Sequence, residues 1–355
     1  MNNPLNHELY MNRCMELALL GLGKTAPNPM VGAVIVYDDK IIGEGFHRQY
    51  GDAHAEVNAI NSVTDKNLLK ESTIYVNLEP CSHFGKTPPC ADLIIQHQFK
   101  RVVISNVDPN VKVRGKGIEK LRNAGIEVIT EVLKDQGDEL NKRFFIFHRK
   151  NRPYIILKWA QTGDRFIDII RQPTDPKTST WITNQEARML VHKWRSEEQS
   201  ILVGTNTAFM DNPQLNVRDW TGKNPIRIII DRGLKLPKNL NLFNKKTSTL
   251  VFTQREMDED DVKSTNLEYT ALPMEAYLPE FLLGELYRRQ IQSVIVEGGA
   301  KVLNNFLEAQ LWDEARVFTG KKYFGEGIPA PIMPVQPYTT EYWDDFKLDI
   351  FRYNY

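Results

Sequence analysis

Apolar and polar residues follow one another along the first part of the chain in a pattern that predicts alternating helices and strands. Apolar residues recur at helical spacing from His7 to Leu20, and the glycines that follow predict the end of that helix. Two apolar runs, Val31–Tyr37 and Ile41–Gly45, flank a polar turn and predict a β-hairpin. The remaining predicted elements are a helix from His54 to about Val63, strand Thr73–Leu78, a helix starting near Cys90, strand Arg101–Asn106, helix Gly117–Ala124 and strand Ile126–Thr130.

A basic stretch that ends in proline, residues 148–153, interrupts this pattern, and the alternation of strands and helices then restarts. Later predicted strands are Tyr154–Trp159, Ser200–Val203, Ile226–Asp231, Thr249–Thr253, Ser293–Glu297 and Glu314–Phe318, with helices Asn184–Glu197 and Ala300–Ala309. The pattern favours an α/β fold in two domains, residues 1–148 and residues 149–355.

Composition narrows the class of protein. The 355 residues are 41% hydrophobic and 25% charged, with 45 basic and 45 acidic side chains. A formal net charge of zero argues against a nucleic-acid partner, because binding along a polyanion calls for a basic excess. Three cysteines make no disulfide framework, and the sequence has neither a leader pattern nor a run of about 20 apolar residues. We therefore expect a cytoplasmic protein with no membrane partner.

The strongest chemical signal is a set of candidate metal ligands with a nearby carboxylate. His54, Cys81 and Cys90 offer one imidazole and two thiolates, which can hold one Zn²⁺ per chain and leave a fourth position open for water. Glu56 can move protons to and from that water as the catalytic acid and base. The arrangement is typical of zinc-dependent base deaminases. His54 and Glu56 can serve one water only if both lie in the first turn of their helix.

Two other side chains compete for roles in this region. Cys14 lies on the apolar stripe of the first predicted helix, which favours a buried core position. His83, between the two candidate cysteines, is an alternative ligand. A zinc-stabilised binding module without catalysis is a further alternative, although that interpretation gives Glu56 no task.

The second half lacks the G-x-G-x-x-G fingerprint of dinucleotide-binding folds. It has Glu297-Gly298-Gly299 between a predicted strand and a helix, where a phosphate can approach the backbone. Arg195 and Arg218 are candidates for binding a phosphate monoester. Arg255, after strand Thr249–Thr253, favours NADPH over NADH because arginine suits the extra phosphate.

Four stretches together resemble the deaminase half of the bifunctional deaminase/reductases of riboflavin biosynthesis: Pro27–Gly32, Gly43–His47, His54–Glu56 and Glu79–Cys90. Other stretches resemble the reductase half: Leu157–Ala160, Trp181–Thr183, Glu186–Arg188, Asp211–Pro213, Leu215 with Arg218, and Glu297–Gly299. The resemblance spans about Leu5 to Gly327. It implies an N-terminal cytidine-deaminase-like α/β/α domain and a C-terminal domain similar in fold to dihydrofolate reductase.

The resemblance also implies two consecutive reactions on one small phosphorylated pyrimidine. Zinc-activated water first removes an amino group from the diaminopyrimidinone ribosyl phosphate, and NADPH then reduces the ribosyl group to ribityl. Implied deaminase substrate contacts are Asn28, His47 and Lys86. Implied reductase substrate contacts are Ser179, Arg195, Leu215, Arg218 and Glu297. Implied NADPH contacts are Ala160, Trp181, Thr207, Asp211, Gly299, Ala300, Lys301, Val302, Leu303, Asn304 and Asn305.

The chain departs from the family pattern in the segment Phe166–Thr180, which is longer than usual before Trp181 and puts the assignment of Ser179 in doubt. Family resemblance favours a homo-oligomer, a dimer or tetramer, joined through the reductase halves. The alternative function is a single-activity nucleoside or nucleic-acid base deaminase with a degenerate second domain.

Overall fold

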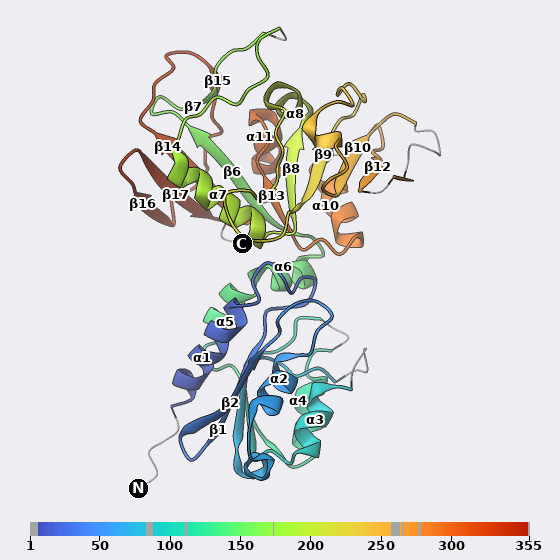
Figure 1. The fold of residues 1–355 in the computed structure, drawn as a ribbon, viewed down its shortest axis with the longest axis vertical. Coiled ribbons are helices and arrows are strands. Elements are labelled where there is room, and N and C mark those ends of the chain that lie inside the picture. Colours follow the sequence, from blue (N-terminus) through green and yellow to red (C-terminus); the bar gives the residue numbers. More distant parts are fainter. Residues whose placement is uncertain are drawn as a thin grey trace. The chain divides into compact units, whose positions relative to one another are not determined.

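The protein is described by a computed structural model that covers residues 6–82, 88–110, 113–172, 174–256, 263–264, 266–275 and 278–353. The chain divides into two compact units, Met1–Asn151 and Arg152–Tyr355, which are considered separately (Figure 1). Every helix among the described residues is too short or too polar to span a lipid bilayer.

The first unit is built on a five-stranded sheet in the order β2-β1-β3-β4-β5, in which β1 pairs antiparallel with β2 and β3. Strands β3, β4 and β5 run parallel, so their carboxyl ends meet at one edge of the sheet. The strands are β1 (Gly32–Tyr37), β2 (Lys40–Phe46), β3 (Thr73–Leu78), β4 (Arg101–Asn106) and β5 (Glu127–Ile129).

Helices cover both faces of this sheet because its central strands are apolar on both sides. Ala33 and Ile35 of β1 pack with residues of α2, α3 and α4, whereas Val34 and Val36 pack with residues of α1. Figure 1 shows α1 and α5 on one side of this sheet and α2, α3 and α4 on the other. Cys14 is fully buried in the second of these cores, as its place on the apolar stripe predicted. The helices are α1 (His7–Leu19), α2 (Ala55–Ser62), α3 (Cys90–Gln96), α4 (Lys116–Asn123), α5 (Lys134–Leu140) and α6 (Lys142–Lys150), with the 3-10 helix η1 (Lys66–Glu71).

The second unit contains a ten-stranded sheet in the order β11-β12-β10-β9-β8-β13-β6-β14-β17-β16. From β12 to β14 the neighbouring strands pair in parallel. The strands are β6 (Tyr154–Gln161), β8 (Ser200–Gly204), β9 (Ile226–Ile230), β10 (Thr249–Thr253), β11 (Lys263–Ser264), β12 (Leu267–Ala271), β13 (Ser293–Val296), β14 (Glu314–Gly320), β16 (Thr339–Tyr342) and β17 (Phe346–Arg352). A separate pair is formed by β7 (Phe166–Asp168) and β15 (Ile328–Pro329).

The core of the second unit lies between its sheet and two helices, α10 (Leu278–Arg288) and α11 (Ala300–Glu308). On the other side, α7 (Gln185–Glu197) stacks Trp194 on Phe318 of β14, with ring centres 5.4 Å apart. The helix α8 (Thr205–Asp211) follows β8 directly, and the 3-10 helix η2 is Asn241–Phe243.

Most of the predicted strands and helices are present within one or two residues of their expected bounds. The basic stretch at 148–153, near which a domain boundary was predicted, begins within a helix, because α6 continues to Lys150. Its apolar residues Phe144, Phe145 and Phe147 are buried, which gives a short helix its stability.

Two glycines inside helices allow a matched stability test. A Cβ on Gly137 of α5 would lie 1.8 Å from Asn106 Oδ1, whereas a Cβ on Gly284 of α10 would meet no atom within 4 Å. We therefore expect Gly137→Ala to destabilise the protein by about 2 kcal/mol or more through overpacking. Gly284→Ala should instead stabilise it by about 0.5–1 kcal/mol through helix propensity. Denaturant unfolding measures both variants, and the same sign for the two would contradict the packing described.

Candidate functional site

The three metal-ligand candidates converge at the N-termini of two helices in the first unit. His54 is the residue before α2, and Cys90 is the first residue of α3. Cys81 follows β3 after a short turn and receives two backbone N–H groups from α3: that of Cys90 donates to Cys81 Sγ at 3.3 Å, and that of Ala91 to the Cys81 carbonyl at 3.1 Å. Exposed N–H groups at a helix start favour negative charge, so they favour the thiolate form of these cysteines.

The donor set fits zinc in chemistry and in spacing. His54 Nδ1 lies 3.3 Å from Cys90 Sγ and 3.6 Å from Cys81 Sγ, and all three ligand atoms lie within 4.8 Å of one another. Tetrahedral zinc with ordinary Zn–S and Zn–N bonds keeps such atoms about 3.6 Å apart. Among the described residues this group of potential ligands contains these three alone. His83 and Lys86 lie outside the described residues.

The protonation of the two thiols is coupled through their contact. A hydrogen bond from the Cys90 thiol holds the pKa of Cys81 well below its usual range, whereas the same contact and burial raise the pKa of Cys90. The Cys81 thiolate also raises the pKa of His54 through a hydrogen bond. Of the two sulfur atoms, Cys81 Sγ is thus the one that takes a negative charge more readily.

Glu56 lies in the first turn of α2, two residues after His54, and its side chain is buried. Burial raises the pKa of Glu56 to about 7, and the negative charge of Cys81 adds to the rise. A carboxyl group whose pKa lies near neutrality can both accept and donate a proton. The helix start thus brings His54 and Glu56 to the same place despite their spacing along the sequence.

Asn28 and His47 lie beside this group. The rings of His47 and His54 are 5.6 Å apart, and Asn28 Nδ2 lies 3.1 Å from His47 Nε2. His47 Nδ1 donates to the Ala53 carbonyl, because a carbonyl oxygen can only accept. Nε2 is therefore the acceptor for Asn28, and burial lowers the pKa of His47 so that the ring stays neutral.

Two side chains from distant parts of the chain hold the loops that carry this site. The carboxylate of Glu79, next to Pro80 and Cys81, accepts backbone N–H groups of Asp108, Gly115, Gly117 and Ile118 at 2.9–3.4 Å. Asn141, buried between α5 and α6, both donates to and accepts from the backbone of Met30, two residues after Asn28. The sequence gives no signal for Asn141, because its partner is 111 residues away.

The second unit has two adjoining pockets at the carboxyl ends of its parallel strands, the position where ligands bind in open α/β sheets. One, of about 510 Å³, is lined by Lys158, Trp159, Ala160, Ile167, Asp168, Arg171, Ser179, Thr180, Ile182, Asn206, Thr207, Met210, Asp211, Glu297, Gly299, Ala300, Lys301, Leu303 and Ile328. The other, of about 470 Å³, is lined by Gly204, Thr205, Asn206, Thr207, Ile230, Asp231, Arg232, Gly233, Lys235, Leu278, Gly298, Gly299, Lys301, Val302 and Asn305. Asn206, Thr207, Gly299 and Lys301 line both pockets, which makes them one groove.

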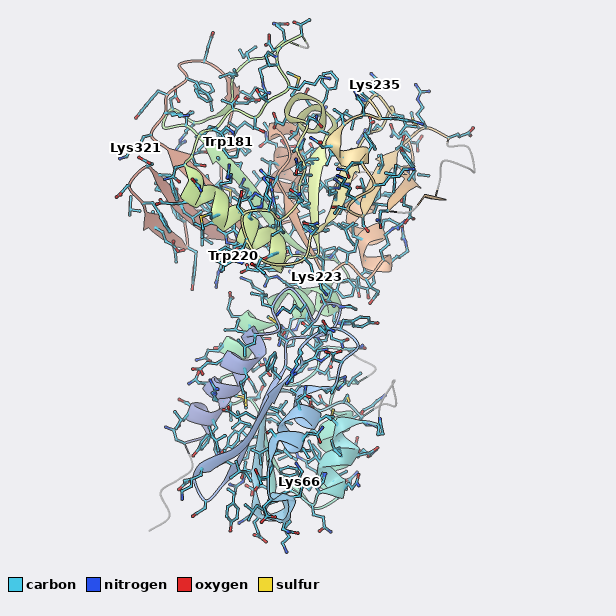
Figure 2. All side chains as sticks on the ribbon, viewed as in Figure 1. Lys66, Trp181, Trp220, Lys223, Lys235 and Lys321 are labelled. Carbon is cyan, nitrogen blue, oxygen red and sulfur yellow. The ribbon has the colours of Figure 1, made fainter. Side chains whose placement is uncertain are left out.

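Most of the residues assigned to NADPH by resemblance lie along this groove, but two do not. Trp181 lines neither pocket; its side chain is 49% exposed, and it lies far from Lys235 in Figure 2. Asn304 of α11 also lines neither pocket. Arg255, the sequence-based candidate for the extra phosphate of NADPH, is absent from the linings, whereas Arg232 and Lys235 are present. Arg232 and Lys235 follow β9. They could not be selected from the sequence, because the sequence does not show that β9 lies beside β8.

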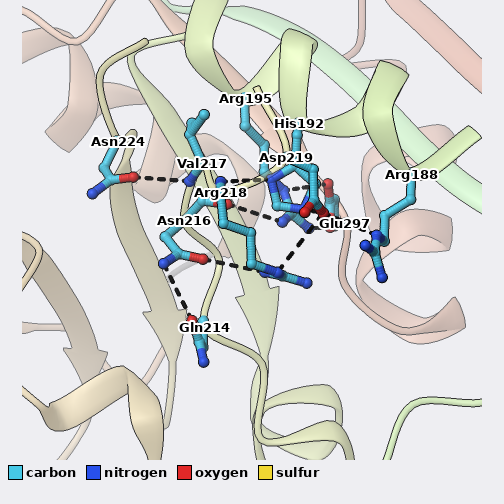
Figure 3. A network of polar contacts seen from close by, with 10 residues as sticks. All are labelled: Arg188, His192, Arg195, Gln214, Asn216, Val217, Arg218, Asp219, Asn224 and Glu297. Carbon is cyan, nitrogen blue, oxygen red and sulfur yellow. Dashed lines mark hydrogen bonds and ion pairs between the residues drawn. The ribbon is translucent and has the colours of Figure 1, made fainter. Parts of the chain in front are cut away.

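Three of the candidate substrate residues, Arg195, Arg218 and Glu297, belong to one polar network (Figure 3). Of these three, Glu297 lines the larger pocket, whereas Arg195 and Arg218 line neither pocket. Arg195 holds Glu297 through two hydrogen bonds, Nε to Oε1 at 3.2 Å and Nη2 to Oε2 at 2.7 Å. Burial alone would raise the pKa of Glu297, but Arg195 and Lys158 outweigh burial and lower it to about 2. Glu297 is therefore an anion at neutral pH, set between two cations.

His192 and Asp219 fix the loop that carries Arg218. His192 Nδ1 accepts the backbone N–H of Arg218 at 3.1 Å, so the proton of the neutral ring sits on Nε2, 3.2 Å from Asp219 Oδ2 (Figure 3). Burial and the neighbouring Arg195 and Arg218 lower the pKa of His192 to about 4. Leu215, another candidate substrate contact, is buried with a positive φ of 49° and lines neither pocket.

Comparison with known proteins identifies the family. The family described as "RibD C-terminal domain" matches residues 153–341, and the "Cytidine and deoxycytidylate deaminase zinc-binding region" matches residues 4–106. The riboflavin biosynthesis protein RibD of Aquifex aeolicus is 42% identical over 90% of this chain and 88% of its own length. The Escherichia coli RibD is 35% identical over 90% of this chain and 89% of its own length. This chain belongs to the RibD family.

Solved structures agree with this assignment. The diaminohydroxyphosphoribosylaminopyrimidine deaminase/5-amino-6-(5-phosphoribosylamino)uracil reductase of Thermotoga maritima superposes with a TM-score of 0.86 at 41% identity and covers 98% of both chains. An Acinetobacter baumannii RibD structure gives the same TM-score at 32% identity and also covers 98% of both chains. The predicted fold class is confirmed: a cytidine-deaminase-like unit is followed by a unit with the dihydrofolate-reductase-like fold of RibD reductases.

Family membership also confirms the predicted class of activity. RibD proteins are bifunctional deaminase/reductases of riboflavin biosynthesis that act on a small molecule, with zinc in the deaminase and NADPH in the reductase. The match over residues 153–341 counts against the alternative of a single-activity deaminase with a degenerate second domain.

Proposed function

We propose that residues 1–148 form the deaminase domain and residues 149–355 the reductase domain, and that the side chains described above carry out two successive reactions on one pyrimidine ribosyl phosphate. The observation that supports the first reaction is the buried Glu56 carboxyl beside the group of His54, Cys81 and Cys90. The observation that supports the second is a groove in which Glu297 and Lys158 share walls with Gly299 and Lys301.

In the deamination, zinc held by His54, Cys81 and Cys90 supplies the Lewis acid that activates water. Glu56 accepts a proton from the attacking water and passes it to the pyrimidine ring nitrogen. It then takes the proton of the newly added hydroxyl group and delivers it to the amino group, which leaves as ammonia while the hydroxyl becomes a carbonyl. Asn28 and the neutral His47 bind the ring through hydrogen bonds, with His47 fixed in one tautomer by the Ala53 carbonyl. Lys86, which lies outside the described residues and between the two cysteines in the sequence, contributes a cation for the substrate.

In the reduction, NADPH supplies hydride to the anomeric carbon of the opened ribose. The pocket with Lys158, Ser179 and Glu297 holds the reacting ends of cofactor and substrate, while the adjoining pocket holds the far end of the cofactor. Arg195 and Arg218 lie close enough to interact electrostatically. Burial lowers the pKa of Arg218, and the positive charge of Arg195 lowers it further. Two neighbouring guanidinium groups favour a dianion, which suits the substrate phosphate.

The remaining assigned contacts support this placement to different degrees. Ala160, Thr207, Asp211, Gly299, Ala300, Lys301, Val302, Leu303 and Asn305 line the groove and are proposed to contact NADPH. The start of α11 offers backbone N–H groups for the cofactor phosphates, and Gly299 before it has φ 48°, a conformation that favours glycine. Trp181, Asn304 and Leu215 have no such support from the pockets.

The two reactions are tested together by following the mass of the product. Zinc-loaded enzyme and the diaminopyrimidinone ribosyl phosphate should give a gain of about 1 Da without NADPH, since a ring amino group becomes a carbonyl. Adding NADPH should give a further gain of about 2 Da from the hydride and a proton. A product that stays at the first mass with NADPH present would remove the reductase half of the proposal.

Glu56→Gln tests the proton-transfer role. The variant should keep one zinc per chain, while ammonia release falls by at least about a hundredfold, the scale of a general acid–base contribution. Its reductase activity on the deaminated pyrimidine should match that of the native enzyme. Ammonia release at the native rate would exclude Glu56 from the mechanism.

Arg232→Ala and Lys235→Ala test where the extra phosphate of NADPH binds. Each variant should raise the KM for NADPH by about tenfold, the scale of one charge-assisted hydrogen bond, and leave the KM for NADH unchanged. Arg255→Ala is the matched control, because Arg255 does not line the groove. A rise in the KM for NADPH in Arg255→Ala alone would contradict this proposal and would favour Arg255 as the residue that binds the extra phosphate.

We also propose a homo-oligomer and a cytoplasmic location. Strand β16 is an edge of the large sheet, and Tyr338 and Tyr342 beside and within it are 61% and 83% exposed. Unpaired edge strands with apolar side chains are suited to association. Sedimentation of the native chain, with Tyr342→Asp for comparison, tests the first proposal. Cell fractionation tests the second, which is supported by the need of Cys81 and Cys90 to stay reduced in order to bind zinc.

A further inference from the structure

The segment between β7 and α7 contains an arginine that none of the assigned contacts includes. Arg171 belongs to the stretch Phe166–Thr180, the one that is longer than the family pattern. Its side chain is only 7% exposed and lines the larger pocket of the second unit. A buried guanidinium in a cofactor pocket needs partners, since desolvating a charge is costly.

Arg171 finds these partners on three separate parts of the chain. It forms an ion pair with Asp168 at the end of β7, and its Nη2 also donates to Asp211 Oδ1 at 2.6 Å. Its Nη1 donates to the Thr178 carbonyl at 2.8 Å and to the Met210 carbonyl at 3.3 Å. One side chain thus ties β7, the returning end of the long segment and the C-terminus of α8 together.

Other contacts place the same segment across the pocket. On one side β7 pairs with β15, with Asp168 opposite Ile328. On the other side Lys177 lies 3.9 Å from the centre of the Phe209 ring of α8. Between these supports Ile167, Ser179 and Thr180 form the part of the pocket wall that this segment contributes. The position of this wall therefore depends on how the segment is fastened to α8.

The charges of Arg171, Asp168 and Asp211 also affect cofactor binding. Asp168 and Asp211 both bond Nη2 of Arg171, so their carboxylates are close neighbours. Burial raises the pKa of Asp211, bonding to Arg171 lowers it, and the charge of Asp168 raises it again. Without the guanidinium, two adjacent carboxylates would face a cofactor that is itself a multiple anion, and like charges at such range repel strongly.

We propose that Arg171 is a positioning residue of the reductase, which holds Asp211 and the segment 166–180 in the arrangement that receives NADPH. The inference rests on the proposed role of Asp211 as a cofactor contact. It predicts that Arg171 acts on cofactor binding and has little effect on the hydride-transfer step or on the first unit.

The test compares Arg171→Gln, Arg171→Lys and the control Arg165→Ala, which removes an exposed arginine just before β7. In Arg171→Gln the KM for NADPH should rise by about tenfold or more, the effect of losing a charge-assisted contact, while kcat stays within about threefold. Arg171→Lys keeps the charge but cannot span both carboxylates, so its KM should fall between those of the native and Arg171→Gln enzymes. Arg165→Ala should behave as the native enzyme.

The kcat of NADPH oxidation at saturating cofactor reports whether the second unit is folded, and ammonia release by the same preparations reports this for the first unit. Native ammonia release and an unchanged KM for NADPH in Arg171→Gln would overturn the inference, as would a loss confined to kcat. If Arg171→Gln does not fold, Asp168→Asn tests the same inference. This variant removes the ion pair between Arg171 and Asp168 and keeps the hydrogen bond between Arg171 and Asp211. Its KM for NADPH should rise by about threefold, and a native value would overturn the inference. A native enzyme that fails to oxidise NADPH would instead refute the proposed reductase function itself.

Discussion

The protein depends first on bringing three soft ligands together where two helices begin. Thiolates are costly to bury, and the backbone N–H of Cys90 at the start of α3 offsets part of that cost by donating to Cys81 Sγ. His54 is the residue immediately before α2, and its imidazole lies close to both sulfur atoms. The same helix start buries Glu56 beside the candidate ligands, so the proposed metal binding and the proposed proton transfer have one structural cause.

In the second unit, strand ends and helix starts form a groove in place of a group of candidate metal ligands. Its parallel strands end at one edge, and the turns after β8, β9 and β13 supply glycines, backbone N–H groups and cations to a single groove. Buried charges there are paired across the fold, Arg195 with Glu297 and Arg171 with Asp168 and Asp211. The pairs Arg195–Glu297 and Arg171–Asp211 join segments far apart in the sequence and so help to hold the groove in shape.

The sequence predicts what is local and misses what depends on strand order. The ligands His54, Cys81 and Cys90 could be chosen because residue type and neighbouring prolines and strand ends are visible in one stretch. Arg232 and Lys235 could not, because their place in the groove follows from β9 lying beside β8. Arg255 has a plausible position at a strand end, but β10 is one strand further out. The partnership of Asn141 with Met30 likewise exists only in three dimensions.

X-ray absorption at the zinc edge of the purified native enzyme tests the central claim most directly. The account predicts one zinc per chain with two sulfur neighbours at about 2.3 Å and two lighter neighbours, nitrogen and oxygen, at about 2.0 Å. The oxygen should be exchangeable solvent. A coordination sphere with three or more sulfur atoms, or with none, would contradict the site described for His54, Cys81 and Cys90.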